Sequence, residues 1–536
     1  RYGLEVLAPV DARGRFTADV PEWAGTRVFD ADPLIVEKLR RDGTLLAAGK
    51  FSHSYPHCWR CKSPIVFRAT EQWFLGMERG DLRARALAEI DRVRWVPAWG
   101  RDRIRGMIET RPDWCLSRQR DWGVPLVAVH CEGCGQAFVS EALCNHVADV
   151  FAREGADAWF TRPLAELLPA GTRCAGCGGT AFRREGDILD VWFDSGVSWR
   201  AVVEQRPELA GHADVYLEGS DQHRGWFHSS LLTGVAVAGR APYDTVLTHG
   251  FLLDGSGRKM SKTLGNVIAP EEVIKRHGAE LLRLWVAAED YRDDVRVSEE
   301  ILGQLVEAYR RIRNTARFLL ANLYDFDPAR DAVAPERLPE LERWVLHRTH
   351  ALVARCRAAY DAFEFHVIYH ALNNFCSVDL SALYLDVRKD RLYCERPGSP
   401  ERRATQTALH GILDALVRLM APVLSFTAED LWQHMPGSGR PESVFLAGLP
   451  EPPAAWCDEA LAATFERLLA VRAAVTKAIE EARQGGLVKQ AAEAEVGLGA
   501  GGVDGLATVL EARGAELPAL FLTAGVTLDG GAGGTE

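Results

Sequence analysis

The spacing of apolar and polar positions changes along the chain and separates two kinds of structure. Between residues 51 and 300, short apolar runs alternate with helical patterns, which is typical of a parallel α/β layer. The apolar runs predict buried strands at Val124–Val129, Asp214–Leu217 and Thr245–Leu253. A helix is expected to begin near His228. The first half of the chain is therefore predicted to be α/β.

From about residue 296 the pattern becomes helical almost throughout. One predicted helix carries an apolar stripe of Tyr309, Ile312, Ala316 and Leu319. A second stripe consists of Leu468, Val471, Val475 and Ile479. Gly485 follows the second stripe at a position that suits a helix C-cap. Both stripes indicate the core of an all-α bundle.

The two ends of the chain lack this regular pattern. Residues 1–50 are turn-rich, and they predict an exposed linker at Asp30–Gly43. Residues 491–536 are rich in Gly and Ala and end in Gly530-Gly531-Ala532-Gly533-Gly534. Such a composition predicts a poorly ordered tail.

The composition is that of a globular protein with several domains. The chain has 536 residues, of which 47% are hydrophobic and 26% charged. No run of 18 apolar residues could span a membrane, and no secretory signal pattern follows Arg1. We therefore expect a cytoplasmic protein with no membrane partner. The net charge of −11 argues against indiscriminate nucleic-acid binding but allows a local basic face.

Six of the 12 cysteines form pairs with two residues between them, which indicates metal binding in a reducing compartment. Two pairs run Cys-x-Gly-Cys-Gly and together supply Cys131, Cys134, Cys174 and Cys177. Four thiolates are the tetrahedral set that structural Zn²⁺ prefers, and the glycines allow a tight turn around it. We predict a zinc knuckle inserted at about residues 130–185. Free thiols at turns, or a redox role, are the less favoured alternatives.

The third pair, Cys58 and Cys61, has no second pair left over in the sequence. Either His53 or His57 completes a poor site, or the partner cysteines lie in sequence outside this chain. The second interpretation is favoured, and the pair is a candidate for a second metal site.

A basic loop is the most distinctive stretch of the sequence. It runs Gly257-Arg258-Lys259-Met260-Ser261-Lys262-Thr263. Two lysines flank a hydroxyl residue, and glycines keep the loop mobile, so it can close over a polyphosphate and neutralise charge that develops during transfer. A solvated basic turn is the alternative.

A second basic feature lies on the predicted helix around residue 312. Arg310, Arg313 and Arg317 share one face, with no acidic residue between Arg310 and Arg317. A solvated helix face and a contact to a nucleic-acid backbone explain this pattern equally well.

Several stretches resemble the class I aminoacyl-tRNA synthetases, and among these the isoleucyl-tRNA synthetases. Lys259–Thr263 is similar to the KMSKS signature of the class, with Thr263 in place of the commoner serine. Tyr216–Phe227 is similar to the isoleucine-specific branch, whereas the valyl, leucyl and methionyl enzymes carry other residues at Glu218–Phe227. Further similar stretches are Tyr55–Cys61, Phe67–Phe74, Asp113–Pro125, Asp190–Gly196, Tyr309–Leu323 and Tyr384–Cys394. The resemblance extends to about residue 490.

The resemblance implies an ATP-dependent ligase that activates L-isoleucine as isoleucyl-adenylate, with Mg²⁺, and transfers it to tRNA(Ile). Lys259 and Lys262 would be catalytic, because they would stabilise the charge on the phosphates. The ATP-binding residues would be Lys259, Met260, Ser261, Lys262 and Thr263. The residues that contact the isoleucyl-adenylate would be Glu218, Gln222, Trp192 and Trp226. For the two tryptophans, ordinary core packing is the alternative.

The same resemblance implies a domain order. The fold would be the second half of a class I Rossmann-type catalytic domain with a zinc-knuckle insertion, followed by an all-α anticodon-binding bundle. The expected parts are the tail of an editing insert at 1–50, the catalytic half at 51–295, a connecting stem-contact region at 296–335, the anticodon-binding domain at 336–490 and the tail at 491–536. Arg310, Arg313 and Arg317 would contact tRNA.

The sequence contains no His-x-Gly-His tetrapeptide, which is the other activating signature of the class, and it begins at Arg1 rather than at Met. We therefore expect a fragment that lacks the first half of the nucleotide fold, is monomeric and is inactive alone. The alternatives are a non-catalytic tRNA-binding remnant of a synthetase and a related valine or leucine specificity.

Overall fold

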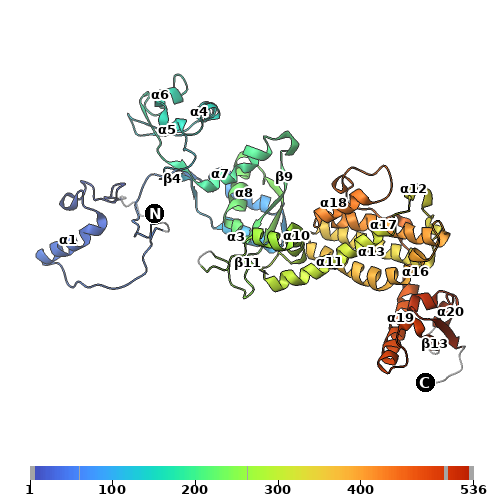
Figure 1. Ribbon diagram of the computed structural model, residues 1–536. Coiled ribbons are helices and arrows are strands. Elements are labelled where there is room, and N and C mark those ends of the chain that lie inside the picture. Colours follow the sequence, from blue (N-terminus) through green and yellow to red (C-terminus); the bar gives the residue numbers. More distant parts are fainter. Residues whose placement is uncertain (1–6, 59–60, 210, 262–263, 500–504, 530–536) are drawn as a thin grey trace. The chain divides into compact units, whose positions relative to one another are not determined.

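The computed structural model describes residues 7–58, 61–209, 211–261, 264–499 and 505–529. The chain forms two compact units, Arg1–Thr248 and His249–Glu536 (Figure 1). No helix among these residues is long and apolar enough to cross a membrane.

The first unit combines short strands with helices. Its helices are α1 (Val28–Arg41), α2 (Leu82–Ile90), α3 (Trp99–Glu109), α4 (Glu141–Glu154), α5 (Ala158–Thr161), α6 (Leu164–Leu167), α7 (Val191–Gly196) and α8 (Trp226–Ala238). Its strands are β1 (Phe74–Leu75), β2 (Arg94–Val96), β3 (Trp114–Cys115), β4 (Ser117–Arg118), β5 (Val129–Cys131), β6 (Ala137–Phe138), β7 (Phe182–Arg184), β8 (Ile188–Leu189), β9 (Ala213–Gly219) and β10 (Tyr243–His249).

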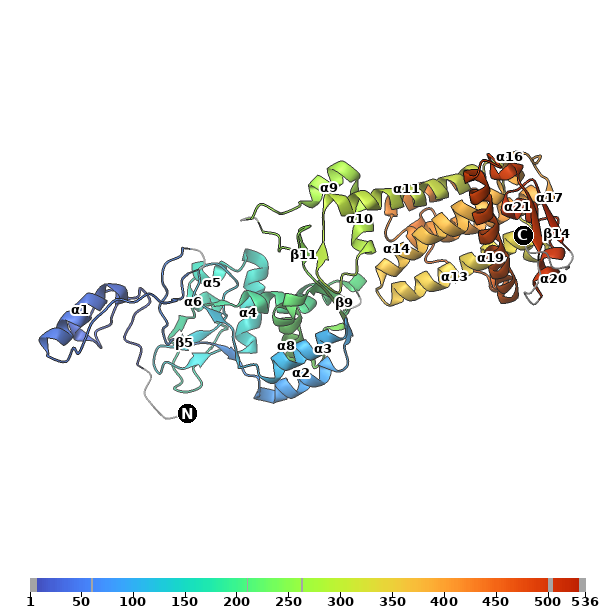
Figure 2. The same ribbon diagram turned by 90° about the horizontal axis from the view of Figure 1, so that it is seen from below.

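A three-stranded sheet of order β2-β10-β9 forms the α/β layer. β10 runs parallel to β2, with Thr245 opposite Arg94 and Leu247 opposite Val96. Helix α2 contacts both α3 and α8 in this layer (Figure 2). Their shared core consists of apolar side chains such as Ile90, Ile104, Phe227, Leu231 and Val246. α8 is buried along most of its length, because it packs inside the layer.

The cysteine-rich insertion has its own small core. Strands β6, β5 and β7 form an antiparallel sheet, and the β4–β8 pair connects the insertion to the α/β layer. α4 is capped by Ser140, whose hydroxyl accepts a hydrogen bond from the Leu143 backbone N–H. Trp159 and Leu167 are fully buried against β5 and α4.

The predicted strands are correct in two of three cases. Asp214–Leu217 lies inside β9, and Thr245–Leu253 contains most of β10 together with β11 (Leu252–Leu253). The prediction of a strand at Val124–Val129 is wrong, because only Val129 belongs to β5. Pro125 lies in this run and makes only an isolated bridge to Ile188. Proline has no N–H to donate, which ends a ladder at that position.

The prediction of an exposed linker at Asp30–Gly43 is also wrong, since these residues form most of α1. Asp30 lies in the first turn, and Lys38, Arg40 and Arg41 lie in the last turn. Acidic residues near the start and basic residues near the end of a helix stabilise it, because they interact favourably with the helix dipole. The linker prediction rested on the exposed character of the segment and did not use this charge order.

The second unit is mostly helical. Its helices are α9 (Pro270–His277), α10 (Ala279–Ala288), α11 (Glu299–Ala321), α12 (Pro328–Asp331), α13 (Glu340–Asp361), α14 (Phe365–Asn374), α15 (Leu385–Val387), α16 (Lys389–Tyr393), α17 (Pro400–Met420), α18 (Ser425–His434), α19 (Glu459–Gln484), α20 (Leu506–Glu511) and α21 (Leu517–Phe521). Its strands are β11, β12 (Val295–Arg296), β13 (Glu495–Gly499) and β14 (Gly525–Asp529).

Helices α11, α13, α14 and α17 form a bundle around one large apolar core (Figure 2). The predicted stripe on α11 is confirmed, because Ile312, Ala316 and Leu319 are buried in that core. A buried ion pair crosses the same core. Arg388 donates to both carboxylate oxygens of Glu342, at 2.6 and 2.8 Å, and Glu342 is 0% exposed.

Within residues 491–499 and 505–529 the structure differs from the poorly ordered tail predicted at 491–536, whereas the run Gly530–Gly534 lies outside the described residues. β13 and β14 pair in parallel, with Val496 opposite Val526 and Leu498 opposite Leu528. These four side chains pack against the core of the bundle. The alternating apolar positions form one half-buried face, which the high glycine content obscures in the sequence.

Candidate functional site

Three of the predicted adenylate contacts meet at Gly225, between the 3-10 turn η5 (Ser220–Arg224) and α8. A Cβ on Gly225 would lie 2.4 Å from Gln222 Oε1 and 3.0 Å from Trp192 Cη2, so only glycine leaves room for both side chains. Gln222 Oε1 accepts a hydrogen bond from the Trp226 backbone N–H at 2.8 Å, at the start of α8. The fold thus brings Trp192, Gln222 and Trp226 together.

The two tryptophans differ in their surroundings. The Trp226 ring stacks on Tyr216, with centroids 4.0 Å apart and planes inclined by 11°. Its Nε1–H donates to the Ser195 carbonyl at 3.0 Å. Trp192 remains 42% exposed, so core packing does not account for it.

Glu218 is the penultimate residue of β9, directly before η5. Its side chain is exposed, and its Oε2 accepts a hydrogen bond from the Gly219 N–H at 2.7 Å. Ligands of open α/β sheets bind where strands end, and Glu218 lies at such an end.

Asp190 fixes the start of α7 and is a residue that the sequence reasoning missed as part of the site. It is 5% exposed, and its carboxylate accepts hydrogen bonds from Trp192 N at 3.2 Å, Trp114 Nε1 at 3.0 Å and Arg118 Nη2 at 2.7 Å. It therefore positions Trp192. An Asp directly before a short helix is an N-cap signal that could have indicated this role.

His223 is a second residue that was missed. It is 0% exposed, and its Nδ1–H donates to the Ser220 carbonyl at 2.9 Å, which stabilises η5. Its ring stacks on Trp95, with centroids 6.0 Å apart, and burial lowers the pKa of its imidazole. No spacing in the sequence marks it, because the aromatic rings that bury it, Trp95 and Trp99, come from a distant segment.

The described part of the basic loop includes Lys259, Met260 and Ser261, whereas Lys262 and Thr263 lie outside the described residues. Lys259 is exposed, and its Nζ lies 5.2 Å from the centroid of the Phe251 ring. Met260 packs against the apolar cluster that contains Trp285. Met260 therefore anchors the loop, while Lys259 faces solvent.

Asp254 and Asn266 close the base of this loop. The Asp254 carboxylate accepts hydrogen bonds from Ser256 N at 3.0 Å, Arg258 N at 2.9 Å and Asn266 Nδ2 at 2.9 Å. Asn266 Oδ1 in turn accepts from Ser261 N at 2.9 Å. The Asn266 amide, followed by the Arg258 backbone N–H, lowers the pKa of Asp254 to about 2. The carboxylate therefore stays ionised in the closed arrangement.

The four predicted zinc ligands converge in the insertion. The sulfur atoms of Cys131, Cys134, Cys174 and Cys177 all lie within 4.8 Å of one another. The Sγ–Sγ distance is 3.5 Å both for Cys131 and Cys177 and for Cys134 and Cys174. The backbone N–H of Cys177, followed by that of Gly176, lowers the pKa of Cys174 to about 7, which favours the thiolate. The cluster can hold a metal ion.

The three cysteine pairs share one backbone turn. Cys131 N donates to the Gln136 carbonyl and Gly135 N to the Cys131 carbonyl. Cys174 and Cys58 form the same two bonds. In each case the cysteine N–H donates to the carbonyl five residues later, and the cysteine carbonyl accepts from the N–H four residues later. In the third turn Lys62 takes the left-handed conformation, φ 61°, where the other turns have glycine. Among the described residues, no further ligand of the kinds that bind metals joins Cys58 and Cys61 in a group of three.

Arg310, Arg313 and Arg317 are all exposed on α11, opposite the buried stripe. Arg310 forms an ion pair with Glu307 at 2.7 Å. The predicted basic face therefore exists, but one of its charges is partly compensated.

Two known protein families match stretches of this chain. The family described as "tRNA synthetases class I (I, L, M and V)" matches residues 18–298, more than half of the 536 residues. The family described as "Anticodon-binding domain of tRNA ligase" matches residues 342–498. The chain belongs to the class I tRNA synthetases. The predicted α/β catalytic part and helical anticodon-binding part are thereby confirmed.

Two curated relatives indicate the branch of this class. The isoleucine–tRNA ligase of Geobacter sulfurreducens is 56% identical over 526 residues, which cover 98% of this chain and 57% of the relative. The isoleucine–tRNA ligase of Syntrophotalea carbinolica is 54% identical over 527 residues, with 98% and 57% covered. The chain thus spans little more than half the length of these relatives.

A solved structure resembles the fold. The Mycobacterium tuberculosis methionyl-tRNA synthetase in complex with methionyl-adenylate aligns with a TM-score of 0.50 and 15% identity, over 75% of this chain and 72% of that chain. At this identity the likeness supports the fold alone.

Proposed function

We propose that this chain carries the adenylate-contacting and tRNA-binding parts of an isoleucine–tRNA ligase, which activates L-isoleucine with MgATP and transfers it to tRNA(Ile). The observation that carries the proposal is the meeting of Trp192, Gln222 and Trp226 at Gly225. It is supported by 56% identity to an isoleucine–tRNA ligase.

In this proposal four residues of the first unit, two exposed and two half-buried, bind isoleucyl-adenylate. The Glu218 carboxylate supplies a counter-charge for the α-ammonium group. Trp192 and Trp226 form aromatic walls beside the branched side chain, and Gln222 completes the contact. An aromatic pocket discriminates by size only weakly, since one methylene is worth about 1–3 kcal/mol.

The basic loop and the cysteines have the remaining roles. Lys259 and Lys262 would contact the ATP phosphates as charge develops on them, within a loop that also includes Met260, Ser261 and Thr263. Zn²⁺ would be held by the four cysteines of the insertion as a structural ion. Cys58 and Cys61, in the same type of turn, would supply half of a second site.

The binding of a non-hydrolysable isoleucyl-adenylate analogue by the chain tests the proposal directly. Calorimetry should give tighter binding for the isoleucyl analogue than for the valyl and leucyl analogues. Glu218→Gln should weaken binding about 10- to 100-fold, because an ammonium group loses its counter-charge. Glu208→Gln, at an exposed glutamate of the same unit, is the matched control. A preference for the valyl or leucyl analogue would contradict the isoleucine assignment.

ATP–pyrophosphate exchange tests the activity itself. We expect no exchange by the chain alone, and isoleucine-dependent exchange when the remaining part of the Geobacter relative is added. Exchange specific to isoleucine by the chain alone would overturn the expectation of inactivity.

The tRNA assignment has its own test. Replacing Arg310, Arg313 and Arg317 with alanine should weaken tRNA binding and reduce the slope of log K against log salt by about one for each phosphate that is no longer bound. Arg355→Ala, an exposed arginine on α13, should change neither quantity. tRNA binding without any adenylate binding would favour the non-catalytic alternative. The monomeric state and the cytoplasmic location stay predictions.

A further inference from the structure

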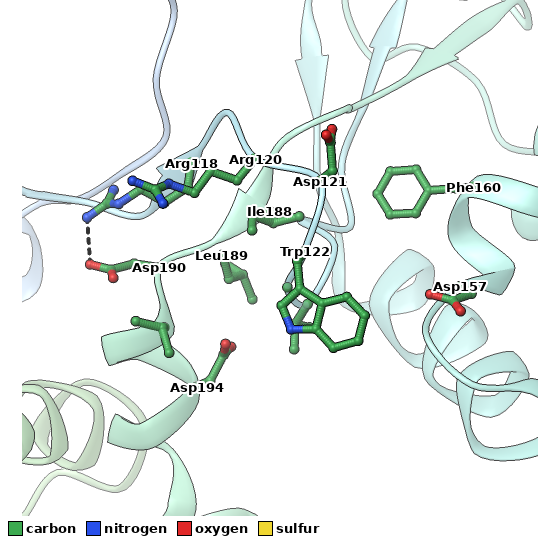
Figure 3. Close-up of a pocket in the computed structure, with 13 residues that line it drawn as sticks. Arg118, Arg120, Asp121, Trp122, Asp157, Phe160, Ile188, Leu189, Asp190 and Asp194 are labelled. Carbon is green, nitrogen blue, oxygen red and sulfur yellow. Dashed lines mark hydrogen bonds and ion pairs between the residues drawn. The ribbon is translucent and has the colours of Figure 1, made fainter. Parts of the chain in front are cut away.

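A cavity of about 740 Å³ lies beside α7, between the β4–β8 pair and the cysteine-rich insertion (Figure 3). It belongs entirely to the first unit. Its distinctive lining residues are Arg120, Asp121, Trp122, Asp157, Phe160 and Asp194. A cavity of this size accommodates a small planar ligand.

An exposed indole dominates this cavity. Trp122 is 93% exposed, and Phe160 is 45% exposed. The backbone after Trp122 lies close against β8, since a Cβ on Gly123 would lie 2.4 Å from Ile188 Cδ1 and the Leu189 N–H donates to the Val124 carbonyl at 2.8 Å. A large aromatic surface on a fixed backbone, left open to solvent, suits a stacking contact.

The cavity also has free hydrogen-bond acceptors. Figure 3 shows Asp194 and Asp157 on either side of the Trp122 indole. In the described part of the chain, neither carboxylate forms a hydrogen bond or an ion pair, whereas Asp190 is paired with Arg118 at 2.7 Å. Burial, and then the nearby Asp190, raise the pKa of Asp194 to about 6, so at neutral pH this group is still mainly a carboxylate that can accept hydrogen bonds. Carboxylates beside an aromatic ring match a flat ligand that carries an exocyclic amine.

The position of the cavity narrows the choice of ligand. α7 is only six residues long, and it places Trp192 against Gly225 while Val191 and Asp194 line the cavity. The cavity is therefore a neighbour of the proposed adenylate site. In the reaction proposed above, the reactant that must reach the adenylate is the single-stranded end of tRNA, whose cytosine and adenine bases carry exocyclic amines.

We propose that this cavity receives an unpaired nucleobase from the single-stranded acceptor end of tRNA, which stacks on Trp122 and donates from its amine to Asp157 and Asp194. The inference rests on the proposed function and adds a site for the tRNA end. Arg120, exposed at the rim and without an ion pair among the described residues, is available to the adjoining phosphate.

The test uses the whole chain and a fluorescent RNA minihelix that ends in unpaired CCA. Stacking on an aromatic side chain contributes about 1–3 kcal/mol per base, so Trp122→Ala should weaken binding of this minihelix about 5- to 150-fold. Phe67→Ala is the control, at another highly exposed aromatic residue of the same unit (78%), and this variant should bind as the unchanged chain does. Binding of the isoleucyl-adenylate analogue should be the same in all three proteins.

A second variant examines the acceptors. The unchanged chain should prefer CCA over UUA ends, because uracil offers a carbonyl where cytosine offers an amine. Asp157→Asn should reduce that preference, since a carboxamide can also donate. Both substitutions are at exposed positions, where loss of folding is not expected.

The outcomes separate the two proposals. Equal minihelix affinity with and without the Trp122 indole, while the analogue still binds, would overturn this inference alone. Binding of ATP in this cavity, in place of the minihelix, would also overturn this inference alone. Failure of both the analogue and the minihelix to bind would overturn the proposed function.

Discussion

The side-chain amide of Asn266 bonds to Asp254 and to the basic loop at the same time. Its Nδ2–H donates to Asp254 Oδ2 at 2.9 Å, and its Oδ1 accepts from the backbone N–H of Ser261 at 2.9 Å. The loop that carries Lys259 is thus closed at its base by side chains that are themselves half-buried or buried. The described part of the loop, up to Ser261, is thus tied to Asp254 through the Asn266 amide.

Asn266→Ala removes both bonds, together with a third that Nδ2–H donates to the Lys259 carbonyl at 3.3 Å, and it leaves the Asp254 carboxylate without its side-chain amide donor. Because the Ser261 amide then has no side-chain acceptor, it should exchange hydrogen roughly 5- to 150-fold faster. Hydrogen exchange followed by mass spectrometry measures this. Asn314→Ala, on the exposed face of α11, should leave the loop unchanged. Equal exchange in both variants would show that the amide does not hold the loop.

The Asp254 contacts also predict a pH dependence. The pKa of Asp254 is lowered to about 2 in the folded loop, below its usual value of about 3.9. Its stabilisation should therefore be complete above about pH 4 and should be lost as the pH falls toward 2. Pepsin cleavage of the loop, normalised to a free peptide of the same sequence, should rise over this range. In Asp254→Asn that pH dependence should disappear; if it persists, another group is responsible.

Gly225→Ala should damage the candidate adenylate site without affecting the rest of the fold. The added Cβ would lie 2.4 Å from Gln222 Oε1 and 3.0 Å from Trp192, so one of these side chains must move. We expect about a tenfold loss of affinity for the isoleucyl-adenylate analogue, which equals about 1.4 kcal/mol. Gly106→Ala in α3, where nothing lies within 4 Å of the new Cβ, is the matched control. Unchanged affinity would place the ligand elsewhere.

The metal prediction concerns the insertion. We expect zinc in the purified chain, measured by mass spectrometry, and its loss in Cys174→Ser, because three thiolates hold Zn²⁺ less well than four. In the unchanged chain, removal of the metal by a chelator should abolish the cooperative unfolding of the insertion. Cys394→Ser, at an exposed cysteine outside the cluster, should retain the metal. Equal metal content in both variants would contradict a site at these four cysteines.

The buried ion pair predicts a large stability effect in the bundle. Glu342→Ala leaves Arg388 charged in the core, so the free energy of unfolding should fall by about 3–5 kcal/mol. The exposed pair between Glu307 and Arg310 is the contrast, because Glu307→Ala should cost at most about 1 kcal/mol. Urea unfolding of the helical unit compares the two. Similar losses would mean that the burial of Glu342 does not decide its contribution.

The sequence by itself determined the features that depend on local spacing. The alternation of strands and helices, the apolar stripe on α11, the spacing within each Cys-x-x-Cys pair and the basic loop all follow from residues close together in the chain. Such features are predictable because the periods of helices and strands and the geometry of a Cys-x-x-Cys turn are fixed by the backbone. The prediction of a poorly ordered tail at 491–536 is wrong for the described residues, because the high glycine content obscures the alternating apolar positions that form β13 and β14.

Only the tertiary structure decided which distant residues meet. Asp190 bonds to Trp114 and Arg118, and Gly225 lies against Trp192, although these contacts join separate segments of the chain. The open indole of Trp122 beside Asp157 and Asp194 has no counterpart in any sequence pattern. The reason is physical: packing brings side chains together across loops whose path the local pattern does not specify, and burial then fixes which polar groups are paired and which remain free.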